Sequence, residues 1–393
     1  MTYNIAIAGA GIGGLTAATL LANQGHHITV FDQFDRPRPV GSGLVIQPVG
    51  QKVLGEIGAL DAARAKGNAV RRMLGHDASH GRRVLDVTYD HDPNGTNVGL
   101  AIHRAALFDA ILQAATAAGV TITPAHEVTS LKNRHLHFKD HAPQGPFDLV
   151  IDSSGVSSPL SPIKAKPLPY GAIWGTVPWR DIGVPMDQLT QVYRRADRMI
   201  GIMPSGTLPG SDAQQAAVFW SMPRDSYDDW RAAPLEDWRR QVTQLWPQAA
   251  PIFEQITDHD QMTMARYAHG TLRTPYADGL AIIGDAAHKA SPQLGQGANM
   301  AMLDASALAK AVAQYPLQEA LPVYAMARRW HVRIYQAMSW AFTPQYQSDS
   351  KILPAFRDHI LFPFSQIQPL PRLLTRLVRG DMIPPMASLT PRD

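Results

Sequence analysis

Residues 6–32, AIAGAGIGGLTAATLLANQGHHITVFD, decide how the chain begins to fold. A predicted apolar strand over residues 5–8 runs directly into Gly9, Gly11 and Gly14, which form the pattern G-x-G-x-x-G before a predicted helix over residues 15–24. In this pattern the first glycine permits a tight turn, the second lets the backbone approach a pyrophosphate, and the third lets helix and strand pack closely. The stretch therefore predicts a strand–helix unit whose helix N-terminus offers unpaired N–H groups to a phosphate.

The second half of the stretch supplies the acidic residue that such a unit needs. Gly25 ends the predicted helix, a second strand follows over residues 27–31, and Asp32 stands directly after it. An acid at this place holds the hydroxyls of an unphosphorylated ribose. A lone glycine pattern is weak evidence, but strand, glycines, helix, strand and acid in this order predict a site for NAD or for the AMP half of FAD.

Composition narrows the class of protein. The 393 residues suffice for two domains, and the net charge of +3 comes without a block of lysine or arginine, so we expect no nucleic-acid partner. The lack of cysteine excludes disulfides, thiolate catalysis and cysteine-ligated metals, and we expect no metal site. The chain shows no basic leader and no apolar run of bilayer-spanning length, which predicts a cytoplasmic protein without integral membrane association.

The chain up to about residue 165 continues as helices and strands. We expect a helical stretch over residues 51–66, polar strand-like sequence over 70–100, and an amphipathic helix from Arg104 that Gly119 ends. Further strands are expected within residues 120–128, 135–140 and 147–151, the last of them buried.

The composition changes from about Tyr170. Six of the eight tryptophans fall between Trp174 and Trp246. Strand-like segments in this region are GAIWGTVPW (171–179), LTQVYRR (189–195), MIGIMP (199–204) and AAVFWSMP (216–223). They predict an antiparallel sheet with aromatic side chains concentrated on one face. Two interpretations of these aromatics stand side by side, an ordinary core or a ligand pocket roofed by the sheet.

An α/β pattern returns near residue 280. A buried strand over 280–283 is followed by Asp285 at its carboxyl end, then by the glycine-rich turn SPQLGQGAN (291–299) and a helix over 299–312. We therefore predict an α/β fold in which a Rossmann-like nucleotide-binding domain is interleaved with an antiparallel-sheet substrate domain and followed by C-terminal helices. The expected boundaries are 1–70, 98–165 and 270–345 for the nucleotide-binding domain, 71–97 and 166–269 for the substrate domain, and 346–393 for the C-terminal helical segment.

Three blocks of residues occur together. They are Gly9-x-Gly11-x-x-Gly14 with Asp32, then Arg38 with Gly41-Ser42-Gly43 and Arg104, and finally GDAAH (284–288) followed by PQLGQGAN (292–299). In this combination the chain resembles the FAD-dependent aromatic hydroxylases, single-component monooxygenases similar to p-hydroxybenzoate hydroxylase. The resemblance covers nearly the whole chain and identifies the domain at 1–70, 98–165 and 270–345 as FAD-binding. A plain NAD dehydrogenase would not account for residues 284–299.

The resemblance implies a role for each matching residue. It implies cofactor contacts for Gly9, Gly11, Gly14, Asp32, Arg38, Arg104, Asp285, Gly295, Gly297, Ala298 and Asn299. The three early glycines would take the FAD pyrophosphate, Asp32 the adenosine ribose and Asp285 the ribityl hydroxyls. The two arginines would lie along the pyrophosphate and ribityl chain. The backbone of 295–299 would meet the pyrimidine edge of the isoalloxazine, Pro292 would border its reacting face, and His288 would be structural.

One loop departs from the family pattern. After the strand at 147–151 the family has Asp-Gly followed by Ser-x-x-Arg, a motif tied to FAD and NAD(P)H. This chain reads IDSSGVSSPLS (151–161), in which Ser154 replaces the aspartate and Ser161 the arginine, while Asp152 stands two residues early. The source of electrons is therefore open between NADH or NADPH bound in an altered way and reduced flavin supplied from elsewhere.

The chemistry that the resemblance implies is aromatic hydroxylation. NADH or NADPH as co-substrate reduces FAD, reduced flavin and O2 form a C4a-hydroperoxide, and a small phenol-like or heteroaromatic substrate takes up its distal oxygen. Candidate catalytic residues are Pro292, Tyr193 and Tyr267, further candidates for moving a substrate proton are Arg195 and His76, and Trp220 is a candidate pocket wall. The expected partners are the small aromatic substrate and O2, and the expected state is a monomer or homodimer.

Other functions of the same fold remain open. A flavin-dependent dehydrogenase or reductase would share the FAD motifs but place no oxygen from O2 in its product. A non-catalytic FAD-binding redox sensor would bind flavin without substrate-dependent turnover. A flavin-dependent halogenase also shares the fold, but WGTVPW (174–179) does not match the Trp-x-Trp-x-Ile-Pro element of that family.

The C-terminal run over residues 345–380 has patches of helical apolar spacing with basic residues. Such a run packs over the substrate domain or touches a membrane surface. We expect packing on the protein, because Pro354, Pro363, Pro369 and Pro371 break any long amphipathic face.

Overall fold

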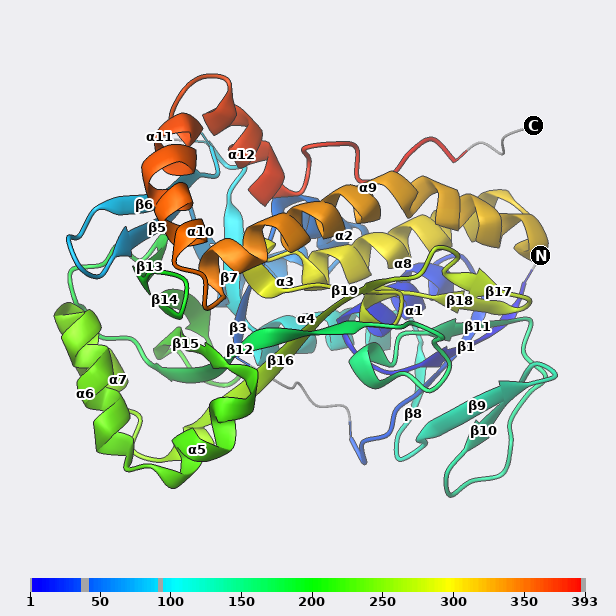
Figure 1. Cartoon of the computed structure of the whole chain (residues 1–393). Coiled ribbons are helices and arrows are strands. Elements are labelled where there is room, and N and C mark those ends of the chain that lie inside the picture. The colour runs from blue at the N-terminus through cyan, green and yellow to red at the C-terminus, as the bar shows by residue number, and fades with distance from the viewer. Residues whose placement is uncertain (1, 37–41, 91–94, 390–393) are drawn as a thin grey trace.

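The computed structural model describes residues 2–36, 42–90 and 95–389. Its first main layer is a six-stranded sheet that holds the N-terminal strand near its centre (Figure 1). In spatial order the strands are β17 (Tyr276–Ala277), β18 (Leu280–Ile282), β11 (Leu149–Asp152), β1 (Asn4–Ala8), β2 (His27–Phe31) and β8 (Thr121–Thr123). All neighbours pair in parallel except β17 with β18. The carboxyl ends of the parallel strands therefore meet at one edge, where ligands bind in α/β sheets.

Helices cover one face of this sheet and a hairpin covers the other. The helices are α1 (Ile12–Ala22), α4 (Arg104–Ala117), α8 (Gly297–Gln314) and α9 (Leu317–Tyr346). Apolar side chains such as Ile5, Leu15 and Leu308 form the core beneath them. On the opposite face, the hairpin of β9 (Val128–Lys132) and β10 (His135–Phe138) packs its Phe138 against Phe31. Burial on both faces explains why the strand sequences read as continuous apolar runs.

The helical stretch expected over residues 51–66 is present, and the structure divides it in two. Two helices, α2 (Pro48–Glu56) and α3 (Leu60–Lys66), occupy this stretch. Gly58 lies between them with a φ of 74°, a left-handed conformation that ends the first helix and turns the chain into the second. A small sheet of β3 (Gly43–Ile46), β7 (Gly99–His103) and β4 (Asn68–Val70) lies nearby.

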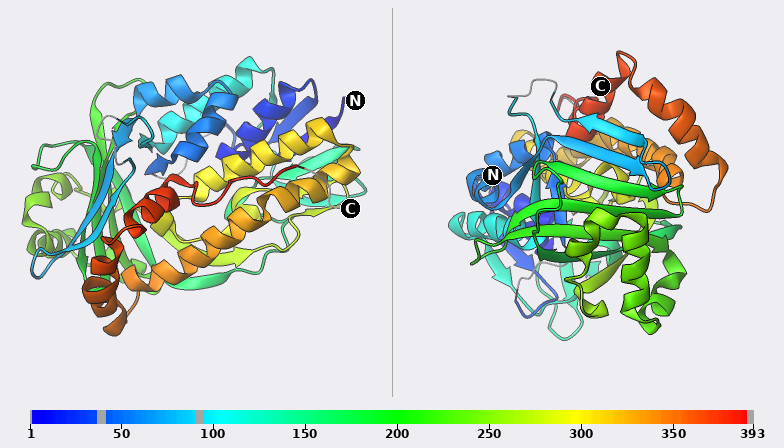
Figure 2. Two further views of the ribbon diagram at one scale, coloured as in Figure 1. Left: turned by 90° about the horizontal axis from the view of Figure 1, so that it is seen from above. Right: turned by 90° about the vertical axis from the view of Figure 1, so that its left-hand side faces the viewer.

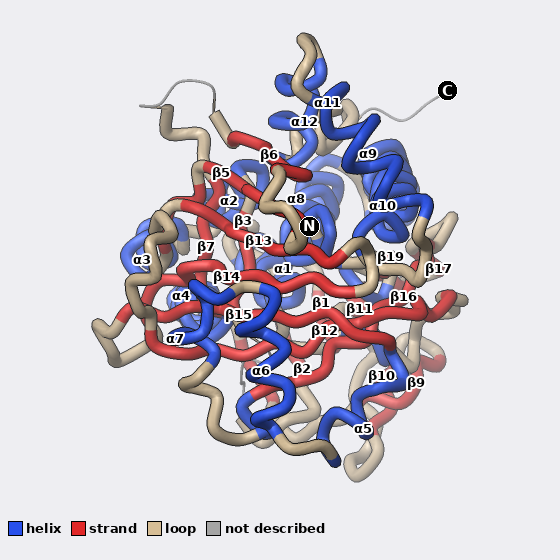
Figure 3. Tube along the Cα trace, turned by 60° about the vertical axis from the view of Figure 1, so that its left-hand side comes forward, coloured by secondary structure: helices blue, strands red, loops and turns tan. Residues whose placement is uncertain are grey.

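The second main layer is an eight-stranded sheet (Figure 3). Its spatial order is β19 (His288–Lys289), β16 (Met262–Thr271), β12 (Lys166–Pro178), β15 (Gln214–Pro223), β14 (Arg198–Thr207), β13 (Gln188–Arg194), β5 (Arg72–Asp77) and β6 (Arg83–Thr88). The pairs are antiparallel, as expected, except for β13 and β5, which run parallel. Residues 72–88 therefore join the later strands in one sheet.

Most of the tryptophans gather in the core between the outer face of this sheet and the helices that cover it. Three short helices cover it, α5 (Tyr227–Ala232), α6 (Leu235–Leu245) and α7 (Ala250–Phe253). Trp220 packs there against Trp238, with ring centroids 6.1 Å apart and near-perpendicular planes. The interpretation of Trp220 as a pocket wall is wrong, because strand alternation turns it away from the side where its neighbour Phe219 lies. For these tryptophans the aromatic concentration is ordinary core packing.

The inner face of the same sheet packs on the first domain. Its buried cluster includes Phe219, Met203 and Ala217, together with residues of β7 and β13. Strand β3 approaches so closely that a Cβ on Gly43 would lie 2.7 Å from the Cβ of Ala217. The glycine therefore allows backbone-to-sheet contact at the junction of the two layers.

The C-terminal segment folds as short helices beside the second sheet (Figure 2). They are α10 (Ile352–Phe356), a π-helical turn (Arg357–Leu361), α11 (Phe362–Ser365) and α12 (Leu370–Arg379). The Thr375 hydroxyl donates to the carbonyl of Thr88 at 2.7 Å, so the segment packs on the eight-stranded sheet, in agreement with the expected packing on the protein. Among the described residues, no helix is both long enough and apolar enough to cross a membrane.

Candidate active site

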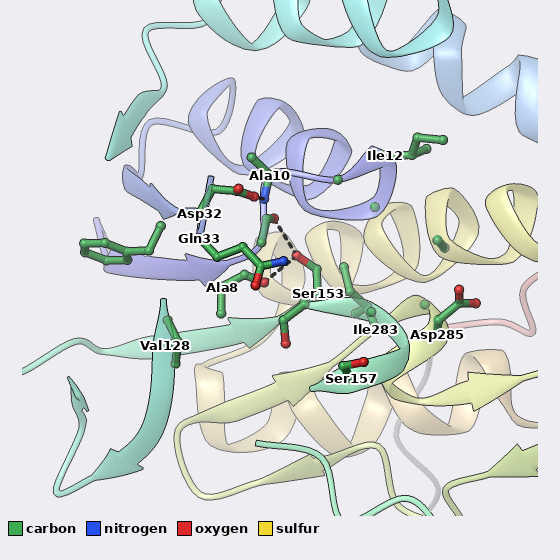
Figure 4. A pocket seen from close by; sticks show the side chains of 18 of the residues that line it. Ala8, Ala10, Ile12, Asp32, Gln33, Val128, Ser153, Ser157, Ile283 and Asp285 are labelled. Atoms are coloured by element: carbon green, nitrogen blue, oxygen red, sulfur yellow. Dashed lines mark hydrogen bonds between the residues drawn. The ribbon is translucent and has the colours of Figure 1, made fainter. Parts of the chain in front are cut away.

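A pocket of about 560 Å³ opens at the carboxyl ends of β1, β2, β11 and β18 (Figure 4). Its walls include the predicted site residues Gly9, Gly11, Asp32, Arg104, Asp285, Gly297 and Ala298. Three separate blocks of sequence thus converge on one cavity. Its volume lies within the range of small-molecule and cofactor sites, roughly 300–1,000 Å³.

The glycine loop shapes the upper wall of this pocket. Gly9 has a φ of 100°, and a Cβ there would lie 2.8 Å from the carbonyl oxygen of Ser153. A Cβ on Gly11 would meet no atom within 4 Å and would enter the open pocket. Gly14 lies outside the pocket, and a Cβ there would overlap the carbonyl of Gly9 and the hydroxyl of Ser153. The space beside Gly11 is therefore open to a ligand, and Gly14 allows close packing of helix and loop.

Asp32 holds the glycine-rich turn and its own loop by two hydrogen bonds from backbone N–H groups. One carboxylate oxygen accepts the Ala10 N–H at 2.7 Å, and the other accepts the Phe34 N–H at 2.9 Å. Each carboxylate oxygen has a second lone pair, so both can also accept a ribose hydroxyl. The side chain is 8% exposed, and that exposed part faces the pocket.

Arg104 and Asp285 place opposite charges in the lower part of the pocket. Burial by surrounding protein lowers the pKa of the Arg104 guanidinium, and the charge of Asp285 partly restores it. Burial likewise raises the pKa of the Asp285 carboxyl, and the positive charges of His288 and Arg104 offset part of that rise. Both side chains face the cavity, so hydroxyl and phosphate groups of a ligand can reach them.

Two helices begin at the pocket. Helix α1 starts at Ile12 and helix α8 at Gly297, both in the pocket wall, and neither has an acidic residue in its first turn. The unpaired N–H groups and the positive end of the helix dipole make each start a site for negative charge. One helix would face a pyrophosphate and the other the electron-rich ring of a reduced flavin.

Besides Gly14, two described residues among the predicted cofactor contacts, Gly295 and Asn299, are absent from the pocket wall. Arg38 falls outside the described residues. Asn299 is fully buried, accepts the Gln47 N–H at 2.8 Å and donates to the carbonyls of Val45 and Gly295. Its side chain therefore ties β3 to α8. Gly295 stands outside the pocket wall with a φ of 61°, where it turns the chain into α8.

Sequence reasoning missed the side of the pocket next to Asp32. Residues 126–129 line it, as do Ser153, Ser154 and Ser157. The His126 ring stacks on His141 with centroids 3.9 Å apart. No motif marks residues 126–129, because strand β9 reaches the pocket only through the tertiary packing of its hairpin, whereas the three serines belong to the altered family motif at 151–161.

In the altered loop at residues 151–161, the acidic side chain of Asp152 forms its hydrogen bonds within the loop. Asp152, completely buried at the end of β11, accepts the hydroxyls of Ser154 and Ser158 at 2.5 Å each. The Ser161 hydroxyl, in the position of the family arginine, donates to the carbonyl of Ala286. The carboxylate thus holds the loop from within, while Ser154 faces the pocket in its place.

A buried ionic cluster supports the pocket floor. Asp304 accepts hydrogen bonds from the Gly284 N–H, from His288 Nε2 at 2.5 Å and from Arg328 Nε at 2.8 Å. Burial alone would raise the pKa of Asp304, but the two cationic partners hold it at about 2. His288 is therefore engaged in structure, which agrees with its expected role.

Pro292 begins a short 3-10 turn over Pro292–Leu294, directly after a cluster of hydroxyls. The Ser291 N–H donates to His269 Nε2 at 3.2 Å, and the Ser291 hydroxyl pairs with Ser339 and Thr343 of α9. These bonds fix the turn between β19 and α8. Because Nε2 accepts a backbone N–H, His269 is held in its neutral form, and burial lowers its pKa in the same direction.

Tyr267 lies on strand β16 with its hydroxyl directed to strand β12. The Trp174 indole N–H donates to that hydroxyl at 2.8 Å, and the Trp174 ring packs on Phe219 at 4.5 Å. Trp174 and Tyr267 are both only partly buried. Burial among protein atoms raises the pKa of the Tyr267 hydroxyl well above its usual value. The hydroxyl therefore stays protonated at neutral pH.

Tyr193, the other predicted tyrosine, belongs to a different cluster. Its ring stands 5.0 Å from the guanidinium of Arg357 and 5.3 Å from the ring of Tyr346, and its hydroxyl donates to Gln191. Arg195 occupies the β13–β14 turn with a φ of 53°, and its carbonyl accepts from Arg357. Tyr193 thus supports the docking of the C-terminal segment.

The pocket suits FAD by its chemistry. It offers a glycine-lined approach at Gly11, two helix N-termini for negative charge, a carboxylate with open lone pairs at Asp32, and Asp285 at the far end (Figure 4). A dinucleotide with a pyrophosphate centre and hydroxyl-bearing arms matches this order. The fold and site therefore define a flavin-binding protein of the α/β class.

Comparison with known proteins gives the family. Residues 2–142 and 168–323 match the FAD binding domain family. A putative 2-heptyl-3-hydroxy-4(1H)-quinolone synthase of Rhodococcus erythropolis is 25% identical over 365 residues, 85% of each chain. The 3-amino-4-hydroxybenzoate 2-monooxygenase of Streptomyces cremeus is 28% identical over 324 residues, 77% of each.

Solved structures show the same fold. The tetrameric form of 2-methyl-3-hydroxypyridine-5-carboxylic acid oxygenase has a TM-score of 0.79 at 21% identity, over 95% of this chain and 96% of that one. HpxO of Klebsiella pneumoniae complexed with FAD has a TM-score of 0.80 at 20% identity, over 97% and 100%. The chain belongs to the FAD binding domain family, and its resemblance to the FAD-dependent aromatic hydroxylases is confirmed. It is an FAD-dependent monooxygenase.

Proposed function

We propose that this monooxygenase hydroxylates a small electron-rich aromatic molecule held between the inner face of the eight-stranded sheet and the turn at residues 292–295. The observation that carries the proposal is the Trp174–Tyr267 pair. These two partly buried aromatics share a hydrogen bond on the inner face of the sheet, and Phe219 packs beside them. Flat aromatic walls with one polar handle suit a phenol-like or heteroaromatic ring.

Tyr267 would orient the substrate as a hydrogen-bond donor. Its oxygen accepts the Trp174 N–H, which leaves its own proton directed elsewhere. Because its pKa is raised, it keeps that proton at neutral pH and donates it in a hydrogen bond to a substrate oxygen. It therefore acts as a positioning group and not as a base.

The pocket residues would hold FAD, which supplies reducing equivalents and oxygen activation when bound. Gly11 and the start of α1 would bind its pyrophosphate, Asp32 its ribose and Asp285 its ribityl hydroxyls. The start of α8 at Gly297 and Ala298 would stabilise negative charge on the ring. Pro292 would border the reacting face and help to keep water from it.

The loop at residues 152–161 bears on which molecule donates electrons to the flavin. Asp152 is buried and already accepts two serine hydroxyls, so it presents no carboxylate to the pocket. We propose that NADH or NADPH still reduces the enzyme, with Ser154 in the place of the family acid. The alternative is that another protein delivers reduced flavin, since Asp152 presents no carboxylate to the pocket.

An anaerobic titration separates these donors. The purified holoenzyme is mixed with NADH or NADPH, and bleaching of flavin absorbance is followed with and without a panel of hydroxylated benzoates and pyridines. Bleaching that one aromatic compound accelerates supports the proposal. No bleaching with either nucleotide and any compound contradicts direct reduction and favours an external reductant.

The role of Tyr267 has a matched control. Tyr267→Phe removes the hydroxyl beside Trp174, and we expect about tenfold weaker binding of the accelerating compound, since one hydrogen bond contributes roughly 1 kcal/mol or more. Tyr193→Phe removes a hydroxyl from the same sheet but from the cluster at Arg357, and we expect unchanged binding. Equal effects of the two variants would contradict the assignment.

A further inference from the structure

The exposed large apolar side chains are unevenly distributed. In the described part of the chain, all of them except Val156 and Met186 belong to α9 or to the segment 352–373. That segment alone exposes Ile352, Phe356, Ile360, Phe364, Ile367 and Leu373. Such a concentration is typical of a surface that meets another apolar surface.

Four of these residues, Ile352, Phe356, Ile360 and Phe364, recur every four residues along one helical run and are here named the apolar stripe. Their exposed fractions are 79%, 43%, 48% and 61%. In an α-helix, steps of four residues would wind around the axis, by about 40° a step at 3.6 residues per turn. The π-helical turn at 357–361 is wider, so it rotates less per residue and keeps the stripe on one side.

The opposite side of the same helices is firmly docked. Arg357 is 2% exposed and lies between the rings of Tyr193 and Tyr346, where it also donates to the carbonyl of Gln345. Pro354 is buried as well. The outward direction of the apolar stripe is therefore fixed by the fold, and the helices project from the body of the molecule (Figures 1 and 2).

The charges around the stripe are mostly positive, and the exposed Asp349 is an exception because its partner Tyr170 is neutral. Lys351, Arg372 and Arg376 are exposed. The nearby acids have partners, since Asp358 pairs with Arg357, Asp349 accepts from Tyr170, and Asp381 pairs with Arg379. The surface is thus apolar along its centre and basic at its margins. This is the composition of segments that lie in a membrane interface.

We propose that the apolar stripe and its basic margin bind the surface of an anionic lipid bilayer. Apolar side chains would enter the headgroup boundary, and Lys351, Arg372 and Arg376 would meet lipid phosphates. A second copy of this chain is the poorer partner, because a two-fold interface places the same patch on both subunits and brings like charges together. The proposal does not depend on the reaction of the enzyme.

The test uses the full-length holoenzyme and cosedimentation with vesicles. One set of vesicles is phosphatidylcholine alone, and the other contains equal parts phosphatidylcholine and phosphatidylglycerol. We expect binding to the anionic vesicles that falls with added salt, and little binding to the neutral ones. Ile360→Ser combined with Phe364→Ser should lower partitioning at least about tenfold, and Arg372→Gln combined with Arg376→Gln about tenfold.

Met186→Ser is the matched control, because Met186 is an exposed apolar residue outside this segment. It should bind vesicles like the parent protein. Flavin content and near-UV circular dichroism confirm that each variant is folded. Equal binding of all variants, or no preference for anionic vesicles, would overturn the proposal. So would a concentration-dependent dimer that Ile360→Ser with Phe364→Ser abolishes while no variant binds vesicles.

Discussion

Gly11 and Gly14 stand three residues apart in one motif, yet substitution should damage the protein in different ways. A Cβ on Gly11 would extend into open pocket, and the residue has a φ of −79° that alanine also adopts. Gly11→Ala should therefore leave the free energy of unfolding of the apoprotein within about 1 kcal/mol, because reduced freedom of the unfolded chain offsets the poorer helix cap. The same methyl group would occupy the space of a pyrophosphate.

The expected loss falls on the cofactor. A methyl group that holds the phosphate away from the N–H groups of α1 removes charge-assisted hydrogen bonds of roughly 1.5–3 kcal/mol each. We expect FAD to bind at least about a hundredfold more weakly to Gly11→Ala, which corresponds to about 3 kcal/mol. Gly14→Ala should instead destabilise the apoprotein by about 1–3 kcal/mol, because its methyl group overlaps the carbonyl of Gly9 and the hydroxyl of Ser153.

Two measurements on the same samples read these effects. Urea unfolding of flavin-free protein gives the stability, and quenching of FAD fluorescence gives the affinity. The reasoning predicts lost affinity with retained stability for Gly11→Ala, and lost stability for Gly14→Ala. A Gly11→Ala protein that retains tightly bound FAD would refute the placement of the pyrophosphate beside this residue.

The remaining predictions concern charges at and below the pocket. Asp285→Asn should weaken FAD binding in the same fluorescence assay, and a variant that keeps the affinity of the parent would contradict the role of this carboxylate in the pocket wall. Asp304→Asn should cost about 3–5 kcal/mol in urea unfolding at pH 7, because Arg328 loses its buried partner. The pKa of Asp304, lowered from 3.8 to about 2, contributes about 2 kcal/mol of stability above that range, which is lost as pH falls toward 2; an unchanged difference between parent and variant at acid pH would count against this.

The nucleotide side of the molecule could be predicted from sequence because its signals are local. The strand at residues 27–31 and the helix starting at Arg104 occur as expected, and Asp32 and Asp285 follow the carboxyl ends of their strands. Glycines, caps and apolar runs specify such units within a few residues. The parallel sheet then brings the strand ends to one edge without further information.

Other parts of the site depend on long-range packing. Strand alternation shows that Phe219 and Trp220 point to opposite faces, but it does not show which face meets the first domain. The role of Asn299 as a tie between β3 and α8 requires the loop at Gln47 to lie against it, and 252 residues separate the two. The burial of Tyr193 by Arg357 likewise depends on where the C-terminal segment docks.

The partners of Asp152, in the loop at residues 151–161 that departs from the family motif, could not be predicted from the sequence. Asp152 stands two residues from the expected position, and its sequence position alone does not reveal its partners. The structure shows that the carboxylate accepts the Ser154 and Ser158 hydroxyls inside the loop. Asp152, Ser154 and Ser158 thus belong to one hydrogen-bonded turn.

The central claim is that this chain uses flavin to place one oxygen atom of O2 on an aromatic ring. The most direct test supplies isotopically heavy O2 to the holoenzyme with NADH or NADPH and the aromatic compound that accelerates reduction, and measures the product mass. We expect one heavy oxygen atom per product molecule and one nucleotide oxidised for each. Nucleotide oxidation without a labelled product, or an oxidised product that carries no heavy oxygen, would contradict this function. Either result would identify a reductase or a dehydrogenase.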